Sequence, residues 1–175
     1  ANHLLGTDQL GRDLFSRVLF GGQVALKVAF LTIGLALIVG IVLGLIAGYG
    51  PAWLDNSIML LFDTIRSVPT IMLALAAVAV VGPSITTVIF VIAVSSIPNY
   101  GRIVRTQTLT IKSKDFVNAE RLMGASLLRI LSIHLLPNIL GPLLILASMD
   151  IPTIIALEAG LSFLGMGVKP PTPSW

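Results

Sequence analysis

The sequence contains no cysteine and few charged residues. Without cysteine, disulfide bonds and thiolate metal sites are excluded. Charged residues make up 11% of the chain, whereas soluble domains contain about 25%. The basic residues are not interleaved with aromatic residues on one face, as they are in nucleic-acid-binding domains. These shortages argue against a soluble protein, and they give no reason to expect a nucleic-acid partner.

The sequence also lacks the motifs that bind nucleotides and metals. The stretch "GTDQLGRD" has two glycines, but it lacks the lysine and the preceding strand of a P-loop. No Walker motif occurs elsewhere, so we predict that this chain does not hydrolyse ATP. We interpret the stretch as a turn followed by an amphipathic helix at the outer membrane surface. His3 and His134 are far apart, and no carboxylate spacing suggests a metal site, so we expect no metal, no cofactor and no enzyme activity.

What the sequence does contain is apolar runs of membrane length. Hydrophobic residues make up 55% of the chain, and the mean hydropathy is +0.98. The runs do not alternate polar and apolar residues as barrel strands do. All but the third approach or exceed the ~20 residues that cross a bilayer as a helix, so we predict an all-α, polytopic transmembrane bundle. The four predicted spans are Val24 to Tyr49, Ile58 to Val81 with a break at "IRSVPT", Ile85 to Ile97 with a continuation past Pro98 left open, and Ile139 to Leu164.

Two local patterns predict contacts within this bundle. Gly40, Gly44 and Gly48 recur every four residues in the first span. On a helix they form one stripe of small residues, where a second backbone can approach closely. Asp63 and Arg66 are three residues apart on the second span, which predicts a local ion pair.

The basic residues predict the orientation of the chain. Six of the eleven lie between the third and fourth spans, and an excess of lysine and arginine marks the cytoplasmic side. We therefore expect the loop from about Arg102 to Pro137 to face the cytoplasm and both chain ends to lie outside. The six are Arg102, Arg105, Lys112, Lys114, Arg121 and Arg129.

Within this loop, the stretch "FVNAERLMGASLLRILSIHLLPN" predicts a short amphipathic helix. Asp115 can cap a helix that starts near Phe116. Phe116, Ala119, Met123 and Leu127 recur at steps of three and four residues, which gives one apolar face. Gly124 then interrupts the helix or allows close packing, and Pro137 marks the next span. The residues alone leave two roles open, an anchor on the membrane surface and a helix that docks in the groove of a partner.

The same stretch resembles the loop motif of permease subunits of ABC importers. That motif runs Glu-Ala-Ala, three residues, Gly, nine residues, then Ile-x-Leu-Pro. Asn118, Ala119 and Glu120 occupy the Glu-Ala-Ala positions, and His134 occupies that of the isoleucine. Asn118, Glu120 and His134 depart from the motif, so the residue that contacts the partner is in doubt. The positions that match are Ala119, Gly124, Leu136 and Pro137.

Further blocks resemble one branch of that family, the second permease of dipeptide, oligopeptide and nickel importers. They are "HLLGTDQLGRDLFSRVLFGGQVAL", "PNYGRIVRTQTLTIKSKDFVNAERLMGAS" and "EAGLSFLGMGVKPPTPSW", in this order. The resemblance implies that residues 1–175 form a single transmembrane permease domain with the type I ABC importer fold. Because members of the branch typically have six spans, it also implies a fragment that lacks the first and last.

The resemblance further implies a set of partners in a prokaryotic cytoplasmic membrane. A second permease would complete the pathway through the lipid, two ATP-hydrolysing subunits would sit on the cytoplasmic face, and a binding protein outside would deliver the substrate. Segment 115–130, with a helix from Phe116 to about Leu128, would be the coupling helix, seated in a groove of one ATPase subunit. The implied coupling residues are Phe116, Asn118, Ala119, Glu120, Met123, Gly124, Ala125 and Pro137.

Carboxylates in the spans suggest additional roles. Asp150 and Glu158 lie in or near the fourth span, where an acid is costly and indicates a function in a pathway or gate. A structural hydrogen bond is the competing interpretation. An intramembrane aspartyl protease with Asp63 and Asp150 as its pair, or a secondary transporter, are the alternative functions. Asp63 lies too close to a predicted cytoplasmic end to form a pair at mid-membrane, and a secondary transporter would leave a cytoplasmic docking loop unexplained.

Overall fold

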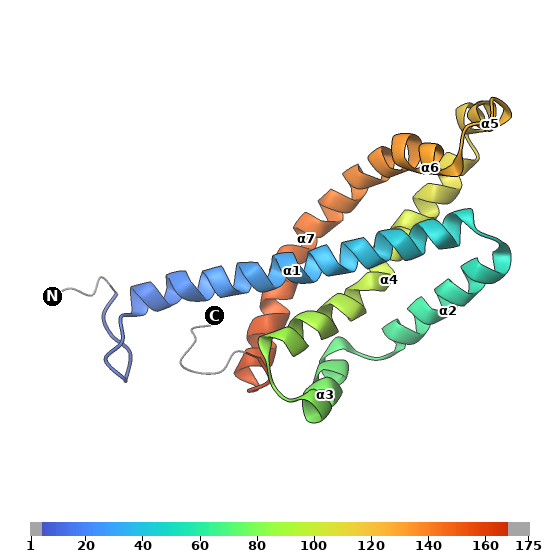
Figure 1. Cartoon of the computed structure of the whole chain (residues 1–175). Coiled ribbons are helices and arrows are strands. Elements are labelled where there is room, and N and C mark those ends of the chain that lie inside the picture. The colour runs from blue at the N-terminus through green and yellow to red at the C-terminus, as the bar shows by residue number, and fades with distance from the viewer. Residues whose placement is uncertain (1–4, 168–175) are drawn as a thin grey trace. The chain divides into compact units, whose positions relative to one another are not determined.

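The computed structural model describes residues 5–167, and within these residues the chain is helical with no β-strand (Figure 1). This confirms the predicted all-α class. The final residues of the last quoted block, from 168 on, and His3 lie outside the described residues. In chain order the elements are α1 (Leu14–Tyr49), α2 (Ala52–Ser67), α3 (Thr70–Val81), α4 (Ile85–Lys112), α5 (Asp115–Leu122), α6 (Leu127–Arg129), the π-helix η1 (Ile130–Leu135) and α7 (Leu136–Phe163).

Three helical stretches are long and apolar enough to cross a membrane: α1, α4, and residues 130–163, which combine η1 and α7. The pair α2 and α3 meets the same test when taken together, which gives up to four spans as predicted. The break between α2 and α3 falls at the predicted place. Val68 is extended, with φ −102° and ψ 125°, because the ring of Pro69 disfavours a helical conformation in the preceding residue.

The third span is longer than the predicted run from Ile85 to Ile97. α4 runs from Ile85 to Lys112, and Pro98 lies inside it. A membrane helix tolerates such a proline where neighbouring groups satisfy the freed carbonyl. The continuation past Pro98 is therefore correct, and an end at Ile97 is wrong. As a result, Arg102 and Arg105, assigned to a loop from the sequence, belong to a helix.

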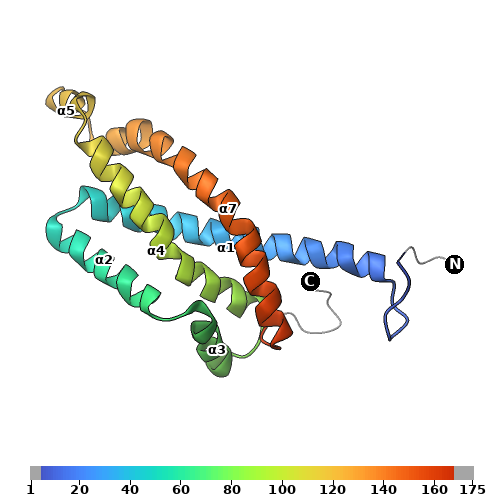
Figure 2. The same cartoon turned by 180° about the vertical axis from the view of Figure 1, so that it is seen from behind.

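The chain divides into two compact units. Among the described residues, unit 1 comprises 5–33, 69–93 and 150–167, and unit 2 comprises 34–68 and 94–149. Unit 2 contains the second half of α1, all of α2, the second half of α4, and the segment from α5 to the first half of α7. Figures 1 and 2 agree that α2 runs alongside the second half of α4 and that α5 lies beyond the end of α4.

In unit 2 the glycine stripe of α1 packs on α4, as predicted. A Cβ added at Gly44 would lie 2.5 Å from the carbonyl oxygen of Gly101, and one added at Gly40 would lie 2.8 Å from Cβ of Tyr100. A Cβ at Gly48 would lie 2.7 Å from Cβ of Thr108. Real Cβ atoms do not approach other atoms so closely, so the two backbones meet only because these residues are glycine.

In unit 1 a turn precedes α1, at the position where a phosphate-binding loop was rejected. The carboxylate of Asp8 accepts hydrogen bonds from the backbone N–H groups of Leu10 and Arg12, both at 2.9 Å, and from Nε of Arg12 at 2.7 Å. The hydrogen bond from the Arg12 backbone is the main reason that the pKa of Asp8 lies below its usual value. Asp13 caps α1, with Oδ2 accepting from the Ser16 N–H at 2.9 Å. A carboxylate therefore takes the donors that a phosphate would need, and the predicted turn is confirmed.

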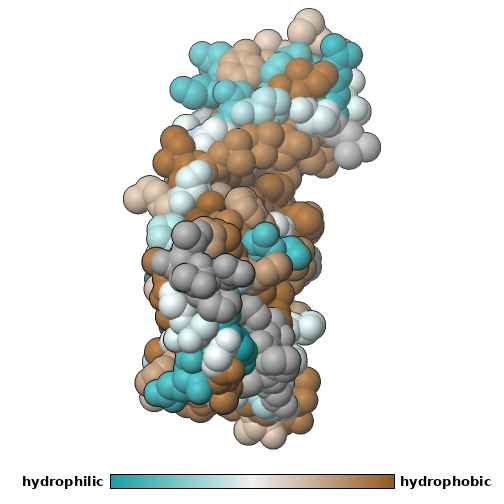
Figure 3. Space-filling model, turned by 90° about the vertical axis from the view of Figure 1, so that its left-hand side faces the viewer, coloured by the Kyte–Doolittle hydropathy of each residue, from teal (hydrophilic) through white to brown (hydrophobic). Residues whose placement is uncertain are grey.

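The surface is apolar along the long helices. Phe30, Ile38 and Ile145 are each more than 60% exposed in the chain by itself. On the face shown in Figure 3, hydrophilic residues gather at the end that carries α5, and hydrophobic residues adjoin them. A multi-pass membrane protein has this distribution, because lipid rather than water contacts its helices.

Candidate functional site

The helix α5 begins and ends at positions set by two different signals. It starts at Asp115, one residue before the predicted start, and its N-cap residue Lys114 makes no side-chain capping hydrogen bond. At the other end, the N–H of Ala125 donates to the carbonyl of Glu120 and the N–H of Gly124 donates to that of Arg121, both at 3.0 Å. This is a Schellman motif, which needs a residue of positive φ, and Gly124 has φ +83°.

The predicted helix from Phe116 to about Leu128 is therefore wrong in its extent. Segment 115–130 contains α5, a turn over residues 123–126, and the next helix from Leu127. Ser126 is the N-cap of that helix, and its hydroxyl oxygen accepts from the N–H of Arg129 at 3.4 Å. A glycine followed two residues later by a serine is the stop-and-start signal that could have been found from the sequence.

The face of α5 that is buried within the chain is not the predicted apolar stripe. Val117 is fully buried, whereas Phe116 and Leu127 are each 47% exposed and Met123 is 79% exposed. The predicted apolar stripe is therefore the outer edge of the segment. Asn118 and Ala119 are exposed as well, and Glu120 is half-buried.

The first attachment of α5 to unit 2 is built around Tyr49, the last residue of α1. The guanidinium of Arg121 contacts the Tyr49 hydroxyl and lies 5.0 Å from the centre of its ring. The ammonium of Lys112 lies 4.9 Å from the same ring and donates to the Tyr49 carbonyl at 3.1 Å. Cations beside an aromatic ring are attracted to its electron-rich face, so Tyr49 joins the ends of α1, α4 and α5.

The second attachment joins α5 to η1. Nε2 of His134 lies 2.9 Å from Oε1 of Glu120. The ring of Phe116 lies 5.5 Å from that of His134, tilted by 56°. Neither His134 Nε2 nor Glu120 Oε2 has a hydrogen-bond partner that meets the angular criteria among the described residues, so the contact rests on the closeness of the two side chains. Two residues that depart from the importer motif are thus in contact, a pairing that spacing alone did not indicate.

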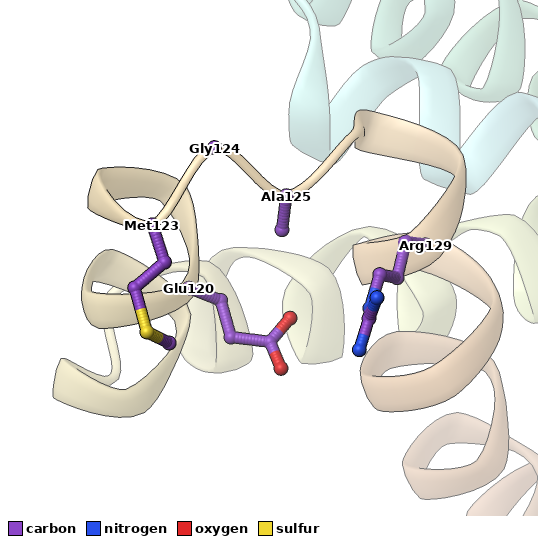
Figure 4. Close-up of a pocket in the computed structure, with 5 residues that line it drawn as sticks. All are labelled: Glu120, Met123, Gly124, Ala125 and Arg129. Atoms are coloured by element: carbon purple, nitrogen blue, oxygen red, sulfur yellow. The ribbon is translucent and has the colours of Figure 1, made fainter.

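An open pocket of about 270 Å³ lies between α5 and α6. Figure 4 shows the carboxylate of Glu120 pointing from α5 toward Arg129, which stands on the opposite wall, and Ala125 pointing into the gap. Met123 and Gly124 complete the lining. Four of the eight sequence-predicted coupling residues therefore line one pocket. Pro137 is separate, as an exposed residue in the first turn of α7.

The predicted carboxylates elsewhere have different surroundings. Glu158 is 1% exposed, and its Oε1 accepts from the Ser162 hydroxyl at 2.7 Å. Its Oε2 is buried without a hydrogen-bond partner in the part of the chain that the structure describes. Asp150 is half-buried. No group of three or more histidine, cysteine or acidic residues suited to a metal is present among residues 5–167.

The predicted ion pair between Asp63 and Arg66 is wrong. Asp63 pairs with Arg102, and Arg66 donates to Oδ1 of Asn99 at 2.6 Å. Both partners belong to α4, which packs beside α2 in the same unit and offers side chains that the spacing along α2 does not reveal. Asp63, which the sequence suggested as one member of an aspartyl protease pair, is thus paired with Arg102.

The comparisons with known proteins agree with this geometry. Residues 40–175 match the family described as binding-protein-dependent transport system inner membrane component. The chain belongs to this family. Membership confirms the resemblance that the loop motif and the further blocks indicated, and the relatives are named as permeases of the branch that those blocks indicated.

Members of the family that resemble the chain are named as peptide permeases. The chain is 40% identical over 175 residues to the dipeptide transport system permease protein DppC of Alkalihalophilus pseudofirmus, covering 58% of it. It is 42% identical to the di/tripeptide permease DppC of Pseudomonas aeruginosa, also covering 58%. Identity to the glutathione permease GsiD of an Escherichia coli strain is 43% over 173 residues, covering 57%. The chain therefore spans less than two thirds of the length of these relatives.

A solved structure shows the same fold. The chain matches the MetNI methionine ABC transporter, determined in inward-facing conformations, with a TM-score of 0.76. The match covers 88% of this chain and 77% of the other, at 22% sequence identity. At that identity the likeness concerns the fold, and it confirms the permease architecture inferred from the sequence.

Proposed function

We propose that this family member is a permease subunit of an ATP-driven importer of small peptides in a prokaryotic cytoplasmic membrane. The membership of the family and the names of the relatives, which cover dipeptides, tripeptides and glutathione, support a peptide cargo. Nickel, the other cargo implied by the resemblance, is the alternative. The pathway would be completed by a second permease, and a binding protein outside would deliver the cargo.

Two ATP-binding subunits on the cytoplasmic side would supply the energy. The observation that carries this part is the position of α5, a helix of eight residues joined to α4 and α6 by short turns. One side of α5 is attached through Val117, Glu120 and Arg121. The other side is exposed in the described part of the chain, where Leu122 is 90% exposed. A partner subunit could therefore contact it.

The exposed edge of the α5 segment is suited to a protein groove. Leu122 and Met123 are apolar and exposed, and Asn118 and Ala119 lie beside them on the same short helix. An apolar edge with polar neighbours is the pattern by which a helix fits a groove on a partner. Movement of the ATP-binding subunits would then shift α5, and this shift would favour one of the two states of the permease over the other.

Cysteine crosslinking tests the docking directly, because the natural chain contains no cysteine. Asn118→Cys and Leu122→Cys place thiols on the exposed side, and Val117→Cys is the matched control, since Val117 is fully buried. In the assembled complex we expect both exposed positions to crosslink to cysteines in the ATPase groove and Val117→Cys not to crosslink. Absence of both bonds, with transport intact, would leave α5 as a membrane-surface anchor.

Asp150 and Glu158 are proposed to act in the pathway or its gate. The buried, half-partnered carboxylate of Glu158 supports this, because an acid at membrane depth is costly unless a function retains it. Glu158→Gln keeps the shape and the acceptor for Ser162. Unchanged uptake of peptide by Glu158→Gln and by Asp150→Asn would reduce both residues to structural hydrogen bonding.

A further inference from the structure

The contact between Glu120 and His134 connects the two parts of unit 2 that must move together if α5 transmits force. Glu120 belongs to α5, and His134 belongs to η1, which continues without interruption into α7. Their side chains are 2.9 Å apart. They are each less than a quarter exposed, at 22% and 24%, so solvent screens their attraction less than it screens a surface pair.

His134 lies in η1, directly before α7, so a displacement of its side chain can act on α7. η1 is a π-helix of six residues, and π-helical turns inside longer helices are rare and occur frequently at functional sites. Ile130 and Leu135, at the two ends of η1, are 1% and 0% exposed. The segment is therefore fixed in the interior of unit 2, while His134 between them reaches toward α5.

His134 is also held from the α7 side. Its carbonyl oxygen accepts a hydrogen bond from Nδ2 of Asn138 at 2.6 Å, and its ring packs against Phe116 of α5. A displacement of the imidazole thus acts on α7 through the backbone of η1 and through Asn138. The Tyr49 attachment, by contrast, joins α5 to α1 and α4 and does not reach α7.

We propose that Glu120 and His134 are the positioning pair that passes a displacement of α5 to η1 and α7. This inference rests on the proposed coupling function of α5 and adds the route by which the displacement reaches a spanning helix. Glu120 and His134 both differ from the residue that the importer motif has at their positions. The two departures are in contact with each other. Loss of the pair leaves α5 attached through Tyr49 and removes its polar side-chain contact with η1, so that only the ring contact of Phe116 remains there.

The first test measures transport per ATP hydrolysed in the reconstituted complex. Glu120→Gln removes the carboxylate and His134→Gln removes the imidazole, and we expect the ratio to fall about three- to tenfold, as for the loss of one coupled contact. Asp115→Asn is the control, since it removes the same charge from an exposed position on the same helix. The exchanged pair, Glu120→His with His134→Glu, restores the contact and should restore the ratio. Unchanged ratios in both single variants overturn the proposal.

A reversible bridge gives a second test that does not depend on packing of the exchanged pair. Glu120→Cys with His134→Cys, joined by a short bifunctional methanethiosulfonate reagent, replaces the ion pair by a covalent link. We expect a low transport-to-hydrolysis ratio before bridging, recovery after it, and loss again when dithiothreitol removes the bridge. A ratio that ignores the bridge overturns the proposed link.

The two proposals can be separated in the same preparation. If the Asn118→Cys crosslink to the ATPase subunit forms while the bridge has no effect, coupling through α5 stands and the Glu120–His134 route is wrong. If the crosslink itself fails, the fault lies in the docking of α5, whatever the bridge does.

Discussion

At the scale of single residues, unit 2 depends on close backbone contact and on charged pairs between α2 and α4. The guanidinium of Arg105 donates from Nε and Nη2 to the two carboxylate oxygens of Asp55, at 2.5 and 2.6 Å. Such a fork fixes both distance and orientation. Arg102 and Asp63 form a second pair, but the Asp63 side chain is 67% exposed. The two pairs should therefore differ in their contribution to stability.

Arg105→Lys should destabilise the protein, although it keeps the charge. A lysine cannot reproduce the two parallel hydrogen bonds to Asp55, and we expect the free energy of unfolding to fall by about 1–3 kcal/mol. The measurement is thermal unfolding in detergent. Arg102→Lys is the matched control, since its partner is exposed, and should cost under about 1 kcal/mol. Equal effects of the two would contradict the assignment of the buried fork as the stronger pair.

Gly44→Ala should be destabilising by about 1–3 kcal/mol through overpacking. The added Cβ would meet the carbonyl oxygen of Gly101, and a backbone atom cannot rotate out of the way. Gly34→Ala is the control on the same helix, because a Cβ there meets nothing within 4 Å. It should be neutral or stabilising by up to about 1 kcal/mol. Comparison of the thermal unfolding of the two variants tests this prediction.

At the scale of elements, the end of α5 determines which residues the segment exposes. The helix stops at Leu122 because Gly124 adopts φ +83° and closes the Schellman motif. A longer helix would carry Met123 and Ala125 around the axis and close the pocket beside Glu120. The geometry of the α5 segment therefore depends on one backbone conformation.

Gly124→Val should impair coupling more than it impairs folding. Valine is strained at positive φ by about 1–2 kcal/mol, and the space around Gly124 is open, so steric contact does not contribute. We expect lower ATP-driven uptake and faster proteolysis of the turn over residues 123–126. Gly124→Asn should be milder, since asparagine tolerates this region better. Gly141→Ala, at an open position within α7, is the control. Wild-type uptake by Gly124→Val would contradict this account.

At the scale of the whole molecule, patterns along the chain predicted where the spans lie in the sequence. They predicted few of the contacts between helices. The apolar runs located the spans, and the spacing of Gly40, Gly44 and Gly48 predicted a close helix contact, because membrane length and small-residue stripes are properties of one segment. The partners of Asp63 and Glu120 were missed because they lie on other helices, 39 and 14 residues away. The end of α5 was left open at Gly124, because an apolar periodicity does not report the φ of a glycine.

The proposed importer makes a prediction about energy source. Uptake of a labelled dipeptide in vesicles that contain the complete complex should stop when ATP is removed while the ion gradient is maintained. Collapse of the gradient by an ionophore, with ATP present, should leave uptake nearly unchanged. The reverse pattern would favour a secondary transporter, and it would leave α5 without a partner that hydrolyses ATP.

The arrangement around Tyr49 provides a spectroscopic probe that requires no engineering. The chain has two tyrosines. Tyr100 is fully buried in unit 2, and Tyr49 lies between the cations of Lys112 and Arg121, where α5 joins α1 and α4. Incorporation of 3-fluorotyrosine into this subunit should give one ¹⁹F resonance for each of these two tyrosines, and Tyr49→Phe and Tyr100→Phe assign them. The resonance of Tyr100 would serve as an internal reference, and that of Tyr49 would report in real time whether α5 stays seated while the transporter turns over.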